Sequence, residues 1–136
     1  LEFRRVLFRS AGPVYIHCRN GTAGTLAKGT PVYITGNVGN TATVIVAAAD
    51  ASNLTKMPAI GILDAALAAN ADGHVVVSGE ITDMDTNGYA VNSALYVANG
   101  GGFTTTAPTN KQPIGRVTRG NSNTGAMVVM GPGVVL

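Results

Sequence analysis

The chain has 136 residues, enough for one domain with its own hydrophobic core. Only 12% of its residues are charged, whereas an ordinary soluble domain has roughly 25%. A surface so poor in charge does not keep a protein dispersed by repulsion, so we expect hydroxyl and amide groups to cover it, as suits a subunit of a larger assembly. The single cysteine excludes an internal disulfide, and no apolar run approaches the length of a membrane span, so we expect no membrane partner.

The first ten residues differ in character from the rest. They carry three arginines and one glutamate, a net charge of +2 that equals the charge of the whole chain. The segment back-translates to a sequence that resembles a common short-read sequencing adapter; the alternative is a basic N-terminal arm. We therefore interpret residues 1–10 as a non-native leader, and residues 11–136 as a single β domain whose natural protein extends further on the N-terminal side. Because the remainder is neutral, the basicity does not indicate a nucleic-acid partner.

Runs of β-prone residues separated by turn residues recur along the domain. The first run, 14–18, precedes Asn20-Gly21, a pair typical of a hairpin turn. Further strands are expected at residues 31–35, 43–47, 74–78, 94–98, 114–118 and 126–130. Helix formers gather only at 49–54 and 63–70, which predicts at most one or two short helical turns. The predicted fold class is all-β, a small barrel or sandwich of short strands.

An internal repeat divides the domain into two halves. Residues 29–34 (GTPVYI) resemble residues 92–97 (NSALYV), each being a small polar turn followed by a strand with tyrosine among branched aliphatics. Two further segments then follow in the same order, 60–63 and 75–79 in the first half, 114–117 and 127–131 in the second.

The alternative to a true repeat is chance similarity between β-rich segments. A true repeat predicts two pseudo-repeated halves that share one core. Tyr33 and Tyr96 should then lie on strands related by a pseudo-two-fold axis, and Ile60 and Ile114 should both enter the core.

The feature most like a metal site is Asp83-Met84-Asp85-Thr86-Asn87-Gly88. Oxygen ligands at alternate positions of a tight turn are typical of the start of a calcium loop, so Asp83, Asp85 and Asn87 are the candidate ligands. The twelfth position of such a loop should be a bidentate glutamate, and here it is Ala94. We therefore interpret the segment as a polar turn and expect neither a metal nor a cofactor.

No group of residues predicts catalysis. His17 and Cys18 are adjacent on a predicted strand, so their side chains should point to opposite faces and cannot act together as nucleophile and base. The sequence holds no nucleophile elbow and no phosphate-binding loop. The one basic cluster in the domain, Lys111 with Arg116 and Arg119, lacks the interleaved aromatic residues that bind single strands. We predict a protein that is not an enzyme and does not bind nucleic acid.

The second half carries a resemblance, through residues 91–97, 102–104, 113–117 and 125–131. This pattern resembles a module of virion proteins of marine tailed phages, and the first half is similar through Lys28-Gly29, Val32-Tyr33 and 59–61, so that the resemblance covers residues 25–133. It is also similar to a broader family of small β-fold proteins that stabilise phage heads. The resemblance implies a structural protein on the virion surface that decorates or stabilises the capsid, with the major capsid protein or fibre subunits as partners.

The alternative function is a tail- or head-fibre module that contributes to receptor or carbohydrate binding. Such a module needs exposed aromatic rings to stack on sugars, and only Tyr89 and Phe103 lie in predicted loops.

The scarcity of charge and the strand edges expected of a β domain favour association, so we expect a homo-oligomer, with a trimer favoured. The candidate interface is Phe103 with Thr104, Thr105 and Thr106, because an apolar ring beside a row of hydroxyls can pair across a symmetry axis without charge. The alternative is that this stretch is a solvated loop.

Overall fold

The computed structural model describes residues 12–131 and 133–136, so the predicted leader lies outside the described residues. Within that part, nine strands and one 3-10 helix, η1 (Leu54–Lys56), form the regular structure, which confirms the all-β prediction. The strands are β1 (Val14–Asn20), β2 (Pro31–Asn37), β3 (Val44–Ala48), β4 (Gly61–Leu63), β5 (Asp72–Met84), β6 (Ala94–Val97), β7 (Phe103–Thr104), β8 (Pro113–Arg119) and β9 (Gly125–Val129). None of the helical structure in the described residues has the length and apolar character needed to cross a membrane.

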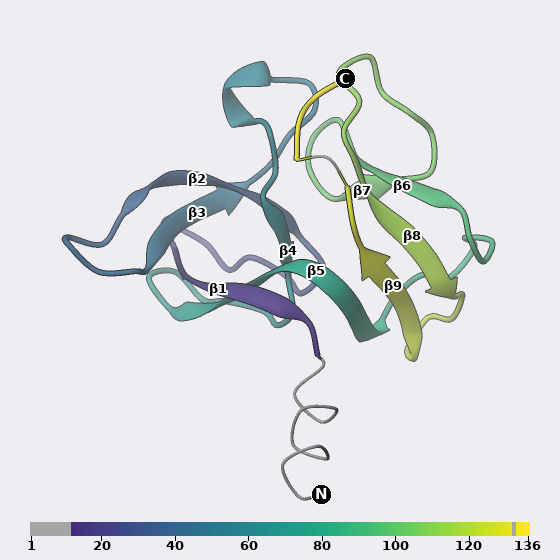
Figure 1. The fold of residues 1–136 in the computed structure, drawn as a ribbon, viewed down its shortest axis with the longest axis horizontal. Helices are drawn as coiled ribbons and strands as arrows, with labels where there is room; N and C mark the ends of the chain where they lie inside the picture. The colour runs from purple at the N-terminus through teal and green to yellow at the C-terminus, as the bar shows by residue number, and fades with distance from the viewer. Residues whose placement is uncertain (1–11, 132) are drawn as a thin grey trace, which may run out of the picture.

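The strands form one hydrogen-bonded series in the order β1-β3-β2-β4-β5-β9-β8-β6-β7. Because β1 also pairs with β5, the first five strands of this series close into a small barrel, on the left of Figure 1. The other four form an open sheet on the right, which ends at β7 (Figure 1). β5 belongs to both parts, since residues 72–78 pair with β1 and residues 79–84 pair with β9.

The strand pairing confirms the repeat. The succession β3-β2-β4-β5 in the first half matches β7-β6-β8-β9 in the second. The register agrees as well, since Pro31 lies opposite Ile62 and its counterpart Ala94 lies opposite Arg116. The two tyrosine strands, β2 and β6, therefore occupy equivalent central places, each between two neighbours.

The turn before each tyrosine strand is built in the same way. In both turns, 27–30 and 90–93, the N–H of the fourth residue donates to the carbonyl of the first. The third residue has a positive φ in both, 87° at Gly29 and 70° at Asn92. A type II turn requires this conformation, which glycine adopts without strain and asparagine tolerates better than most residues.

The two halves share one core, as the repeat predicts, and the barrel encloses another core of its own. The core inside the barrel consists of Cys18, Leu26, Val32, Val46, Leu63, Leu67 and Val75. A second core fills the space between the barrel and the open sheet, and includes Ile62, Val76, Leu95, Val97, Ile114, Val117 and Met127. The adjacent residues of β4 point to opposite faces, so Leu63 enters one core and Ile62 the other. Ile114 is buried as predicted, whereas Ile60 is only half-buried and packs against the barrel core.

One local prediction needs correction. Asn20-Gly21 is not a hairpin turn, because β1 pairs with β3 and β5 and not with the next strand, β2. At 64–70, where the sequence allowed a short helix or a turn, the chain forms a turn and one bridge, from Leu67 to Leu26. The bridge extends the barrel wall, and Leu67 is buried there.

Candidate functional site

The segment with calcium-like spacing closes the end of β5. Met84 is buried in the second core, and the N–H of Asn87 donates to Oδ1 of Asp85 at 3.1 Å, an internal turn contact. Thr86 is fully buried, and its hydroxyl donates to the carbonyl of Arg119. Asp83 is exposed and has a φ of 57°. No group of three or more histidine, cysteine or acidic residues in the described part of the chain is placed to hold a metal ion.

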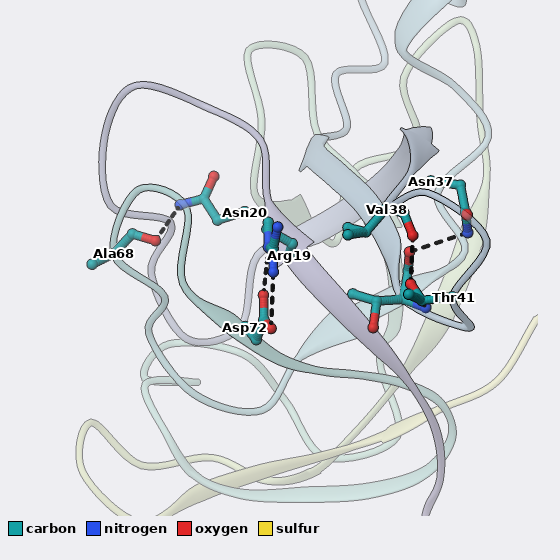
Figure 2. A network of polar contacts seen from close by, with 8 residues as sticks. Arg19, Asn20, Asn37, Val38, Thr41, Ala68 and Asp72 are labelled. Carbon is teal, nitrogen blue, oxygen red and sulfur yellow. Dashed lines mark hydrogen bonds and ion pairs between the residues drawn. The ribbon is translucent and has the colours of Figure 1, made fainter.

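Asn20 is the corresponding buried polar residue in the barrel. Its Nδ2 donates to the carbonyls of Gly24 at 2.8 Å, Leu67 at 2.9 Å and Ala68 at 3.2 Å. The contact with Ala68 is drawn in Figure 2. Its Oδ1 accepts from both the N–H and the hydroxyl of Thr22. The side chain therefore ties two loops to the end of β1, which is a structural role.

The candidate interface, 103–106, lies at β7, the end strand of the series. Phe103 is half-buried and packs against the second core and against Tyr89, with ring centroids 5.9 Å apart. Thr104 Oγ1 accepts from the N–H of Thr106 at 3.1 Å, while Thr105 and Thr106 are exposed. The structure thus directs the aromatic ring inward, and only the two outer threonines are left as an exposed hydroxyl surface.

Asp50 joins the two halves beside this segment. Its Oδ1 accepts from the hydroxyl and the N–H of Ser52 and from the N–H of Gly100 at 2.7 Å. These hydrogen bonds, above all the one from the Ser52 hydroxyl, lower the pKa of Asp50 below its ordinary value. The carboxylate holds in place the glycine-rich loop that precedes β7.

The outer face of the barrel brings together five side chains, which we call the histidine face: Tyr15, His17 and Arg19 from β1, and Asp72 and His74 from β5. His17 lies directly opposite His74 in the strand register, with ring centroids 5.0 Å apart. The Tyr15 ring lies 4.4 Å from the ring of His74.

One step further along the histidine face, Arg19 Nε donates to Asp72 Oδ1 at 2.7 Å and Nη2 donates to Oδ2 at 3.3 Å (Figure 2). The contact with Arg19 lowers the pKa of Asp72.

The meeting of the two histidines was not predicted from the sequence. They are far apart in the chain, and only the β1–β5 register places them opposite each other. The alternation of side chains along β1 was the available signal, and its local prediction is confirmed: His17 is exposed, while Cys18 is buried. Burial raises the pKa of the Cys18 thiol, which keeps it protonated and unreactive.

A small cavity lies between the two halves. Its volume is about 40 Å³, which leaves room for a few water molecules. It is lined mainly by equivalent residues of the repeat, among them Ala59 and Pro113, Ile60 and Ile114, and Val77 and Val129.

In comparisons with known proteins, no protein-family model and no curated protein matches the chain.

Proposed function

We propose that the chain is a non-enzymatic structural protein of a phage particle, displayed on the virion surface, where it decorates or stabilises the capsid. The proposal rests on the resemblance of residues 25–133 to virion modules. The proposal is supported by buried polar side chains whose hydrogen bonds hold the fold together. Gln112, for example, is buried and makes two hydrogen bonds of 2.7 Å to the backbone of Ala59, which join the two halves.

The observation that carries the association part of the proposal is the position of β7. Among the residues that the structure describes, β7 pairs only with β6, at the open end of a series whose other end closes on itself. The exposed Thr105 and Thr106 follow directly. Since β7 has only two residues, a partner would gain few backbone hydrogen bonds there and would contact mainly side chains. A hydroxyl surface with few charges suits a fixed contact with further copies of this chain or with a capsid subunit.

Sedimentation of the purified chain at tens of micromolar tests this proposal. We expect a homo-oligomer, with a trimer favoured, whose interface buries on the order of 1,200 Å² or more. Replacing Thr105 and Thr106 with lysine should shift the mass toward the monomer, because the charges would be desolvated at the contact. The matched control replaces Ala23 and Thr25, which are exposed on a barrel loop, with lysine and should leave the mass unchanged.

The binding arm uses capsid particles that lack this protein. The wild-type chain should sediment with such particles, and the Thr105/Thr106 lysine variant should do so more weakly. A wild-type chain that is strictly monomeric and does not bind these particles would contradict the decoration function. That result would favour the alternative, a module of a longer fibre chain that contributes to receptor or carbohydrate binding.

A further inference from the structure

The two histidines of the chain meet on one exposed face, although they are 57 positions apart in the sequence. They are direct cross-strand partners of β1 and β5, so their side chains rise from the same face of the barrel. His17 is exposed and His74 is half-buried, and both imidazoles therefore border solvent. We propose that His17 and His74 together bind one late first-row divalent metal ion, of the class of Ni²⁺, Cu²⁺ and Zn²⁺.

The spacing of the rings fits such an ion. A metal held about 2.0–2.1 Å from one nitrogen of each ring places the ring centroids about 4.5–5.2 Å apart for nitrogen–metal–nitrogen angles of about 90–110°. The centroids of His17 and His74 are 5.0 Å apart, and their planes are inclined by 50°. The separation of the rings is therefore compatible with one shared ion, and the strand pairing fixes the two backbones in advance.

The surroundings favour this class of ion over others. Neutral imidazole is a preferred ligand of copper, nickel and zinc, whereas calcium and magnesium take oxygen ligands. The carboxylate of Asp72, which belongs to this face, is already engaged by Arg19, so the ion pair adds no net charge. Tyr15 lies against the His74 ring and restricts its rotation from one side. Water molecules would supply the remaining ligands, because the face is open to solvent.

Metal binding here would also fasten the barrel. β1 closes the barrel through its pairing with β5, and the two histidines belong to these two strands. An ion that binds the folded chain but not the unfolded chain raises the apparent stability as its concentration exceeds the dissociation constant.

The test uses the full chain without a histidine tag, titrated with NiCl₂, ZnCl₂ and CuCl₂ by calorimetry and by thermal melting. We expect one ion per chain and a melting temperature that rises with the metal concentration. His17→Thr and His74→Thr should each weaken binding about tenfold or more, because a chelate of two ligands becomes a single ligand. A matched control, His17→Thr combined with Ser122→His, keeps two histidines in the chain but moves the second one to the exposed turn between β8 and β9, and it should bind as weakly as His17→Thr alone.

A spectroscopic arm avoids any dependence on variants. Substoichiometric Cu²⁺ added to the wild-type chain should broaden the imidazole proton resonances of both histidines together. Broadening of one histidine alone, no binding at millimolar metal, or equal affinity in the two single variants and the wild type would each overturn the proposal.

Discussion

The closed barrel and the open sheet are built from the same succession of strands, yet only one of them closes. In the barrel, β1 covers the outer edge of β5 and also pairs in parallel with β3, from Cys18 opposite Val44 to Asn20 opposite Val46. In the second half, residues 79–84 of β5 cover β9 in the same antiparallel manner. The strand equivalent to β3 is β7, and no pairing joins it to β5 in the described residues.

The loop before β7 explains the difference. Gly100, Gly101 and Gly102 all have positive φ values, between 75° and 103°, which an extended strand cannot accommodate. Instead of pairing as part of a strand, Gly100 donates its N–H to the carboxylate of Asp50, which belongs to the first half. β3 has five residues where β7 has two, so the second half lacks the strand that would complete its ring. Closure therefore depends on the length of the strand at this position as well as on the loop before it, although the central strands of the two halves have the same register.

The first half compensates for the opening. Gly29 is buried, and a Cβ atom added to it would lie 3.0 Å from Cε of Met84 and 3.7 Å from Cε1 of Phe103. The turn at 27–30 therefore packs against the side chains of β5 and β7 that a closing strand would otherwise bring together. The two halves are equivalent in pairing but not independent in packing.

The largest expected effect tests whether the equivalence of the halves extends to energetics. A Cβ atom at Gly61 would lie 2.2 Å from the carbonyl oxygen of Val76, and one at Gly115 would lie 2.1 Å from that of Val128. Because backbone atoms would have to move, Gly61→Ala and Gly115→Ala should each reduce the free energy of unfolding by about 3 kcal/mol. Urea denaturation measures both changes.

The control for the glycine pair is Gly24→Ala, since a Cβ atom there meets nothing within 4 Å. Its effect should stay within about 0.5 kcal/mol. A loss confined to one of the two positions, 61 or 115, would show that the halves differ in energetics despite their matching register.

This part of the fold was accessible from the sequence. The repeated Ile-Gly pairs at 60–61 and 114–115 aligned the halves, and the structure has that alignment residue by residue. The expected strand at 74–78 was too short, however, because Gly79 and Glu80 interrupt the apolar pattern. Gly79, with a φ of 120°, lets β5 continue past the crossing chain, where a Cβ atom would lie 2.7 Å from Cα of Pro13.

The candidate sites were less accessible than the fold. The meeting of His17 and His74 depends on a register between strands that are far apart in the chain, and no local pattern specifies it. Asn20 before glycine favours a turn locally, but its amide is instead fixed by loop carbonyls whose positions only the tertiary structure determines. Local propensity therefore located the strands, and long-range contacts decided the role of the polar residues.

The next prediction compares two buried polar residues, Asn20 at the end of β1 and Thr86 just after the end of β5. Asn20 follows Cys18 in the barrel as Thr86 follows Met84 in the second half, and both are fully buried. Asn20→Ala leaves buried carbonyls without donors and should cost about 2 kcal/mol, whereas Thr86→Val removes one hydroxyl and should cost about 1 kcal/mol.

Chemical denaturation with Thr118→Val as the exposed control measures this difference, and the control should change stability by less than about 0.5 kcal/mol. Equal losses for Thr86→Val and the control would refute a structural role for the Thr86 hydroxyl.

A smaller effect is the loss of stability at low pH. Two contacts contribute to it, the Arg19–Asp72 ion pair on the barrel and the contact that Asp50 makes between the halves. The pKa values of both Asp72 and Asp50 are lowered in the folded chain, by hydrogen bonds from Arg19 and from Ser52 respectively. A carboxyl with a lowered folded pKa stabilises the fold above its unfolded pKa, near 3.9, and loses that contribution as the pH falls through the folded pKa.

We therefore expect the melting temperature to fall between neutral pH and about pH 3, modestly because both carboxylates are exposed to solvent. Asp72→Asn and Asp50→Asn should each make this fall smaller, and the double variant should reduce it further. A pH dependence identical in all four chains would contradict the assignment of the two carboxylates.

The smallest expected effect is that of calcium on the segment 83–88, and the comparison of the halves supplies the reason. Between Ile16 and Cys18, β1 advances by two residues while its partner β5 also advances by two. Between Ile81 and Met84, β5 advances by three residues while its partner β9 advances by only two. β5 therefore has one extra residue, a bulge, between Ile81 and Met84, and Asp83 of the calcium-like segment lies in it.

Calcium should accordingly leave the melting temperature unchanged, and so should a calcium-selective chelator, since a true site would add stability as the free calcium concentration exceeds its dissociation constant. The measurement compares the wild-type chain with an Asp83→Asn, Asp85→Asn variant at millimolar calcium, after transition metals have been removed so that the histidine face does not contribute. A rise in melting temperature in the wild type that is lost in the variant would show that the bulge holds a calcium ion after all.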